Sequence, residues 1–109
     1  MLLTIKDSAG ATHTIIVQAQ DGITDHSGAI DATGASQPVM PENLQRSGFY
    51  FQNTSSHNMT VNELGNDATA PGAWVIPPNG SFPPSGYPVS TNAINVAGTM
   101  GDTYIAREW

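Results

Sequence analysis

The sequence predicts an all-β fold: an antiparallel β-sandwich, jelly-roll-like in the preferred version, with an N-terminal β-hairpin. Short runs of alternating apolar and polar residues recur along the chain, and such alternation is typical of half-buried strands. Clusters of Gly, Pro, Asn and Ser separate these runs, so that strands recur about every 8–12 residues, as in sandwiches and barrels. No stretch shows the apolar spacing of an amphipathic helix. Periodicity does not fix the order of the strands.

The clearest strand pattern lies between residues 48 and 64. Phe49 and Phe51 alternate with Tyr50 and Gln52, which is the period of a strand that buries one face. Residues 53–58 favour a turn, because short polar side chains such as Asn and Ser hydrogen-bond the nearby backbone. Apolar positions return at Met59, Val61 and Leu64. We therefore expect a β-hairpin over this segment.

The N-terminal segment, residues 1–20, is a second expected hairpin. Residues 2–6 and 13–18 are the apolar strand candidates, and Gly10 between them can supply a turn at positive φ. An isolated two-stranded hairpin is marginal in water. We therefore expect it to pack on the main body or on a partner.

Residues 21–46 are the least periodic part of the chain. A short strand is a candidate at residues 29–33, and a single helical turn at residues 41–45, with Pro41 in the first helical position. The segment is either an irregular linker or a strand that leads into a sandwich body at residues 47–109. We expect one domain overall.

The second half of the chain continues the strand–turn pattern. Asn79-Gly80 is a strong turn dipeptide. Residues 81–88 contain three prolines, so they cannot donate a full ladder of hydrogen bonds, and we expect an extended, edge-like segment. The remaining strand candidates are residues 73–76, 93–97 and 103–109.

Composition excludes several classes of partner. Of the 109 residues only 11% are charged, and the formal net charge is −6. The three bases are Lys6, Arg46 and Arg107. Binding to nucleic acid or to an anionic membrane surface needs several clustered bases, so neither is expected. The chain has no cysteine and no apolar run of the ~20 residues that span a bilayer. Its first residues do not resemble a signal peptide, so we expect synthesis in the cytoplasm.

No motif in the sequence indicates an enzyme or a cofactor. His13, His26 and His57 lack the spacing of metal ligands, and the Asp residues of the 21–31 segment do not match a calcium loop. The chain has no G-x-S-x-G elbow and no glycine motif for phosphate. We expect a protein without catalytic, cofactor-binding or metal-binding residues.

Aromatic residues and two arginines are the candidates for a partner interface. Phe82 and Tyr87 lie in a stiff, Pro-rich segment that presents side chains at low entropic cost, and Trp109 is a further anchor. The alternatives are a Pro-blocked sheet edge for the first two and closure of the sandwich edge for Trp109. Arg46 and Arg107 are candidates for specific ion pairs with a partner, or for solvated positions at strand ends.

Two segments of the chain together resemble a family of small virion proteins encoded by tailed phages. The resemblance spans about four-fifths of the chain and consists of strand–turn patterns. The weaker segment covers positions 5–7 and 9–10. The stronger one covers Arg46, Phe49, 51–53, Ser55, Met59, 61–62, 75–77, 80–82, 90–91, 93–94, Val96, Gly98, Gly101, Tyr104 and 107–109.

The resemblance implies a non-enzymatic capsid decoration, or cement, protein. Such a protein would act as a homo-oligomer, a dimer or a trimer, on the virion surface, where it would bind the major capsid protein and stabilise the shell. The alternative is a receptor- or glycan-binding module of a phage tail or head fibre, in which Trp74, Tyr87 and Trp109 stack on sugar rings. A small polysaccharide-degrading domain is the third hypothesis.

Overall fold

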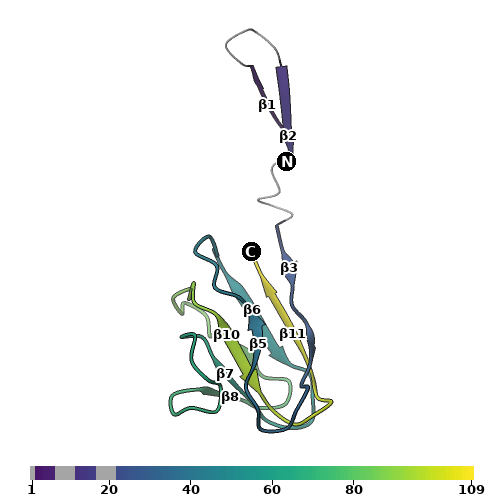
Figure 1. Cartoon of the computed structure of the whole chain (residues 1–109), viewed down its shortest axis with the longest axis vertical. Helices are drawn as coiled ribbons and strands as arrows, with labels where there is room; N and C mark the ends of the chain where they lie inside the picture. The colour runs from purple at the N-terminus through teal and green to yellow at the C-terminus, as the bar shows by residue number, and fades with distance from the viewer. Residues whose placement is uncertain (1, 7–11, 17–21) are drawn as a thin grey trace.

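The computed structural model describes residues 2–6, 12–16 and 22–109, with side chains from residue 22 onward (Figure 1). Eleven strands and no helix occur in this part of the chain. Two antiparallel sheets pack face to face as a sandwich, and a separate pair of strands precedes them. The predicted all-β, antiparallel sandwich is confirmed.

The strands are short, as the frequent Gly and Pro predict. They are β1 (Leu2–Lys6), β2 (Thr12–Ile16), β3 (Thr24–Asp25), β4 (Gly28–Ala29), β5 (Gln37–Met40), β6 (Phe49–Asn53), β7 (Met59–Asn62), β8 (Trp74–Ile76), β9 (Ser81–Phe82), β10 (Ile94–Ala97) and β11 (Thr103–Glu108).

The strand pairs are nested along the chain. The first sheet has the order β3-β11-β6-β9, with β4 also paired to β11, and the second has the order β5-β10-β7-β8. The pair β7–β8 is innermost, and β6–β9, β5–β10 and finally β11 with β3 and β4 enclose it. Successive pairs alternate between the sheets. The sandwich is therefore a series of nested antiparallel pairs, distributed over two layers.

The segment from residue 48 to residue 64 is not a hairpin, so that prediction is wrong. Both strands form where the alternation places them, but β6 pairs with β11 and β9, whereas β7 pairs with β10 and β8. The connection between them crosses from one sheet to the other. Alternation in sequence shows which face of a strand is buried, but it does not show which strand lies beside it.

A buried asparagine fixes this crossing. Asn53 is fully buried, and its amide nitrogen donates to the carbonyls of His57, at 2.6 Å, and Ile76, at 2.9 Å. Its side-chain oxygen accepts from the backbone N–H and the hydroxyl of Ser55. One side chain therefore supplies the partners that a sheet ladder would otherwise give, and it ties the crossing to β8.

The segment from residue 22 to residue 46 contributes strands to both sheets. β3 and β4 pair with β11, and β5 forms the edge of the second sheet beside β10. The strand candidate at residues 29–33 overlaps β4 only at Ala29, and residues 30–33 form no strand, so most of that prediction is wrong. The sequence did not predict β5, which contains Pro38. Pro is compatible with this edge position.

The predicted helical turn at residues 41–45 is wrong. These residues instead make a single hydrogen-bonded turn, in which the Arg46 N–H donates to the Asn43 carbonyl at 3.1 Å. The Asn43 side-chain oxygen accepts from the Gln45 N–H, and this local bond competes with a helix.

The core lies between the two sandwich sheets and follows the alternation of the strands. Phe49 and Phe51 of β6 are buried while Tyr50 between them is exposed. Tyr104 and Ala106 of β11 face the same interior. The core cluster consists of Ile30, Val39, Met40, Phe49, Phe51, Met59, Val61, Ile76, Phe82, Ile94, Val96, Tyr104 and Ala106.

The N-terminal hairpin forms a two-stranded sheet of its own. β1 and β2 pair antiparallel, from Leu2 opposite Ile16 to Lys6 opposite Thr12. Among the described strands, neither joins a sheet of the sandwich. The predicted turn at Gly10 and the end of the second predicted strand, residues 17–18, lie outside the described residues.

We expect Asn53→Asp to lower the free energy of unfolding by about 3 kcal/mol, because a carboxylate cannot donate to the two buried carbonyls. Asn58→Asp, at the exposed end of the same crossing, is the control and should stay within about 0.5 kcal/mol of wild type. Urea denaturation measures both variants. Equal losses at the two positions would contradict the role of Asn53.

Candidate functional site

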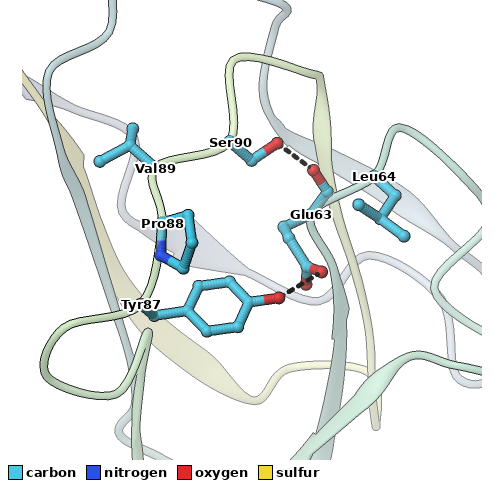
Figure 2. Close-up of a pocket in the computed structure, with 6 residues that line it drawn as sticks. All are labelled: Glu63, Leu64, Tyr87, Pro88, Val89 and Ser90. Carbon is cyan, nitrogen blue, oxygen red and sulfur yellow. Dashed lines mark hydrogen bonds between the residues drawn. The ribbon is translucent and has the colours of Figure 1, made fainter.

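An open pocket lies beside the end of β7. It has a volume of ≈ 300 Å³ and is lined by Glu63, Leu64 and residues 87–90, which are Tyr, Pro, Val and Ser (Figure 2). The first two follow β7 directly, and the others belong to the connection between β9 and β10. The pocket is therefore built where the innermost strand pair meets a Pro-rich connection.

Glu63 places a carboxylate in the wall of this pocket. It follows β7 directly and is only 4% exposed, like Asn62 before it. Its Oε1 accepts a hydrogen bond from the Tyr87 hydroxyl at 3.2 Å, as Figure 2 shows. Its Oε2 is buried and accepts no hydrogen bond from the described residues. The Ser90 hydroxyl donates to the Glu63 carbonyl and fixes the opposite wall of the pocket.

Tyr87 remains a hydrogen-bond donor to this carboxylate. Burial raises the pKa of the Tyr87 phenol, and the charge and hydrogen bond of Glu63 raise it further, against a smaller opposing effect of Trp74. The phenol is therefore protonated at neutral pH. It occupies one carboxylate oxygen of Glu63 and leaves the other without a donor.

An aromatic cluster surrounds Tyr87 and closes the sandwich between β8 and β9. The ring centroids of Trp74 and Tyr87 are 5.7 Å apart in an edge-on arrangement. Phe82 lies 5.3 Å from Trp74, 5.6 Å from Tyr87 and 5.8 Å from Phe49. Phe82 is buried in the core, whereas Trp74 keeps 41% of its surface exposed. Of the two predicted anchors in the Pro-rich segment, Tyr87 reaches the pocket and Phe82 supports it from within.

The predicted interface residue Arg46 lies in the interior. Its Nη1 donates to the carbonyls of Ser90, at 2.7 Å, and Asn92, at 2.9 Å. Its Nη2 donates to the Pro41 carbonyl at 2.8 Å and lies 3.5 Å from Glu108 Oε2. The side chain is fully buried. Arg46 therefore joins three separate stretches of chain, and one of them is the pocket wall at Ser90.

Glu108 extends this polar network toward β3. Its carboxylate accepts from the Asn43 amide and lies 2.8 Å from His26 Nε2. Burial raises the pKa of Glu108, but the hydrogen bond of Asn43 and the charges of Arg46 and His26 outweigh that effect and lower it. Glu108 is therefore ionised at neutral pH and balances the buried guanidinium.

The remaining predicted anchors lie on the outer face of the first sheet. Arg107 is 54% exposed, and its Nε lies 3.8 Å from Asp25 Oδ1. Trp109 is about half exposed, and its indole packs against Gly48, where an added Cβ would lie 2.6 Å from the ring. The backbone of Trp109 pairs with that of Gly48. These two residues are accessible, but they do not share a site with Tyr87.

The structure therefore divides the predicted interface residues among three places: the pocket, the interior and the outer face. The sequence interpretation missed Glu63. The sequence carried no clear signal for it, because Val61, Asn62 and Glu63 are all buried and the strand alternation ends before position 63.

The histidines of the sandwich pair with carboxylates rather than with one another. His26 lies beside Glu108, and His57 Nδ1 lies 2.8 Å from Asp102 Oδ2. Within residues 2–6, 12–16 and 22–109, no group of three or more His, Cys, Asp or Glu side chains is arranged to hold a metal ion. The same residues contain no helix of the length and apolarity needed to cross a bilayer.

Comparisons of the chain with protein-family models, with curated proteins and with solved structures found no significant match. The likeness to phage virion proteins stays a prediction from the sequence.

We expect Arg46→Lys to lower the free energy of unfolding by about 3 kcal/mol, because one ammonium cannot reach three carbonyls and Glu108 together. Arg107→Lys makes the same chemical change at an exposed position, and its effect should be below about 1 kcal/mol. Thermal and urea unfolding of both variants measure the difference. Similar stability of the two variants would contradict the structural role of Arg46.

Proposed function

We propose that this chain is a non-enzymatic structural protein of a phage virion, a decoration or cement protein that binds the assembled shell and stabilises it. The observation that carries the proposal is the N-terminal hairpin. Its two strands pair only with each other among the described residues, while β3 to β11 complete both sheets of the sandwich without it. The chain thus carries a β-element that its own sandwich does not use.

A two-stranded sheet is marginally stable alone, so the hairpin gains most from packing against another protein. The backbone groups on the outer edges of a strand pair can also take up a further strand, a common way for one protein to attach to another. In this proposal the hairpin is the attachment to the major capsid protein or to a second copy of the chain.

The strand order supports a jelly-roll-like sandwich. Counting β3 and β4 as one strand, eight strands lie in two four-stranded layers, and the pairs are nested from β7–β8 outward. Jelly rolls built from two such layers recur in viral capsid and lectin domains. The fold is therefore compatible with a virion role, although fold alone does not define a function.

The energetic logic of a cement protein needs no chemistry at the binding site. A protein that binds only the assembled shell stabilises that shell by mass action. Many copies on one capsid, each a dimer or trimer that touches several subunits, add avidity without further contacts. The charge-poor surface of the chain suits such contacts, because few ions must be desolvated.

The test uses capsids assembled without the chain and a variant of the hairpin. Thr4→Pro removes a backbone donor in the middle of β1, and Thr4→Val keeps a β-branched residue there. We expect wild type and Thr4→Val to decorate the capsids in electron micrographs and to raise their melting temperature, and Thr4→Pro to do neither. Thr4→Pro should leave the melting of the free sandwich unchanged.

Two outcomes would contradict the proposal. If wild type neither binds these capsids nor appears on the heads of virions labelled with immunogold, the chain is not a cement protein. If Thr4→Pro binds as well as wild type, the hairpin is not the attachment.

A glycan-binding module is the second candidate, and the exposed ring of Trp74 beside Tyr87 favours it. Saturable binding on a glycan array that Tyr87→Ala abolishes would support this module. Tyr50→Ala, at an exposed tyrosine of the other sheet, is the matched control and should retain the binding.

A further inference from the structure

The pocket beside β7 contains a buried carboxylate oxygen that lacks a hydrogen-bond donor. Glu63 is more than nine-tenths buried, and its Oε2 receives no donor from the described residues, whereas Oε1 is bonded to Tyr87. A buried anionic oxygen without a partner is energetically costly. A ligand that brings a positive charge and a donor to this oxygen would remove that cost.

The walls of the pocket are mostly apolar. Leu64 is 58% exposed, and Pro88 and Val89 are exposed beside it, so the rim offers hydrocarbon surface to a ligand. The volume of ≈ 300 Å³ is at the small end for a ligand pocket. A short aliphatic chain that ends in a charged head fits this combination, whereas a sugar ring would leave its hydroxyls against apolar walls.

We propose that this pocket binds a primary ammonium on an aliphatic stem, the side chain of a lysine from a partner protein. The four methylenes of lysine would lie along Leu64, Pro88 and Val89, and the ammonium would bond the free oxygen of Glu63. The net charge of −6 on the chain adds a long-range attraction for a basic partner.

The state of Glu63 selects ammonium over guanidinium. Arginine binds a carboxylate best through two parallel hydrogen bonds, one to each oxygen. Because the Tyr87 hydroxyl already occupies Oε1, only Oε2 is free. A single free oxygen matches the point charge of lysine better than the planar fork of arginine.

Tyr87 controls access to the carboxylate. The free oxygen of Glu63 is covered in this conformation, and Figure 2 shows the Tyr87 ring beside Pro88 with its hydroxyl pointing at the carboxylate. Residues 83–89 form few backbone hydrogen bonds. Outside the strand pairs, the one described for them runs from the Tyr87 N–H to the Pro84 carbonyl at 3.1 Å. An outward shift of this segment that keeps the Tyr87–Glu63 hydrogen bond would therefore uncover Oε2 without breaking a strand pair.

The far wall, in contrast, is held in place. The Ser90 hydroxyl donates to the Glu63 carbonyl, and Arg46 donates to the Ser90 carbonyl. Ser90 and Arg46 are positioning residues, because they keep this part of the connection against the end of β7.

The inference goes beyond the proposed virion role and does not depend on it, because the probe is a small molecule. Nα-acetyl-lysine methylamide is titrated into the ¹⁵N-labelled full-length chain, with the norleucine, arginine and methyl glucoside analogues as comparisons. We expect saturable amide shifts at Glu63, Leu64, Tyr87, Val89 and Ser90 with the lysine probe, with a dissociation constant of about 10 mM or below.

Glu63→Gln keeps the shape of the side chain and removes its charge, and it should weaken lysine binding at least about tenfold. Glu42→Gln makes the same change of charge at an exposed position outside the pocket and should bind as wild type does. Leu64→Ala, at an exposed residue, is a second variant that should fold normally and weaken binding through loss of contact with the stem.

The proposal fails on any of three results. The first is no saturable shift with the lysine probe. The second is equal or stronger binding by the norleucine, arginine or glucoside analogue at the same residues. The third is equal affinity of Glu63→Gln and Glu42→Gln for the lysine probe. Each of these results would leave the capsid test unaffected.

Discussion

The structure depends on one buried guanidinium. Arg46 donates to carbonyls at Pro41, Ser90 and Asn92 and faces Glu108, so it holds the β5–β6 and β9–β10 connections against the last strand. Sheet ladders cannot satisfy these carbonyls, because they lie between strands rather than within them. A planar donor with fixed directions can bond several of them together, which a lysine cannot do. The position of the β9–β10 connection, and therefore the pocket against Glu63, follows from this interaction.

Other buried polar side chains also hold connections in place through hydrogen bonds. Asn53 fixes the crossing from β6 to β7, and Asn62 accepts from the Leu64 N–H at the end of β7. Fully partnered polar groups of this kind favour one arrangement of the connections over others. Glu63 differs from these two asparagines, because its Oε2 has no donor within the described residues. Glu108 Oε2 also lacks a hydrogen bond there, but it lies 2.8 Å from His26 Nε2 and 3.5 Å from Arg46 Nη2. That difference is what makes the pocket a candidate for binding rather than only a part of the fold.

Sequence reasoning predicted the fold class and most strands, because the alternation around Phe49, Phe51 and Ile94 matches the buried faces. It did not predict the crossing at Asn53, since a turn within a hairpin and a turn between sheets use the same residue types. It placed Arg46 at an interface, because nothing in the local sequence distinguishes an arginine that bonds carbonyls 44 and 46 residues away from a solvated one. The candidate pocket combines Glu63 with Tyr87, which are 24 residues apart in the sequence. No local sequence pattern predicts a contact between residues so far apart.

The most direct measurement is NMR of the Arg46 guanidinium in the folded chain at low temperature. We predict separate, slowly exchanging Nη proton resonances, with scalar couplings across hydrogen bonds to the carbonyl carbons of Pro41, Ser90 and Asn92. Arg107, which is exposed, should give a single averaged Nη signal and serves as the internal control. An averaged Arg46 signal without such couplings would show that the guanidinium does not hold these connections, and the structural basis of the pocket would be lost.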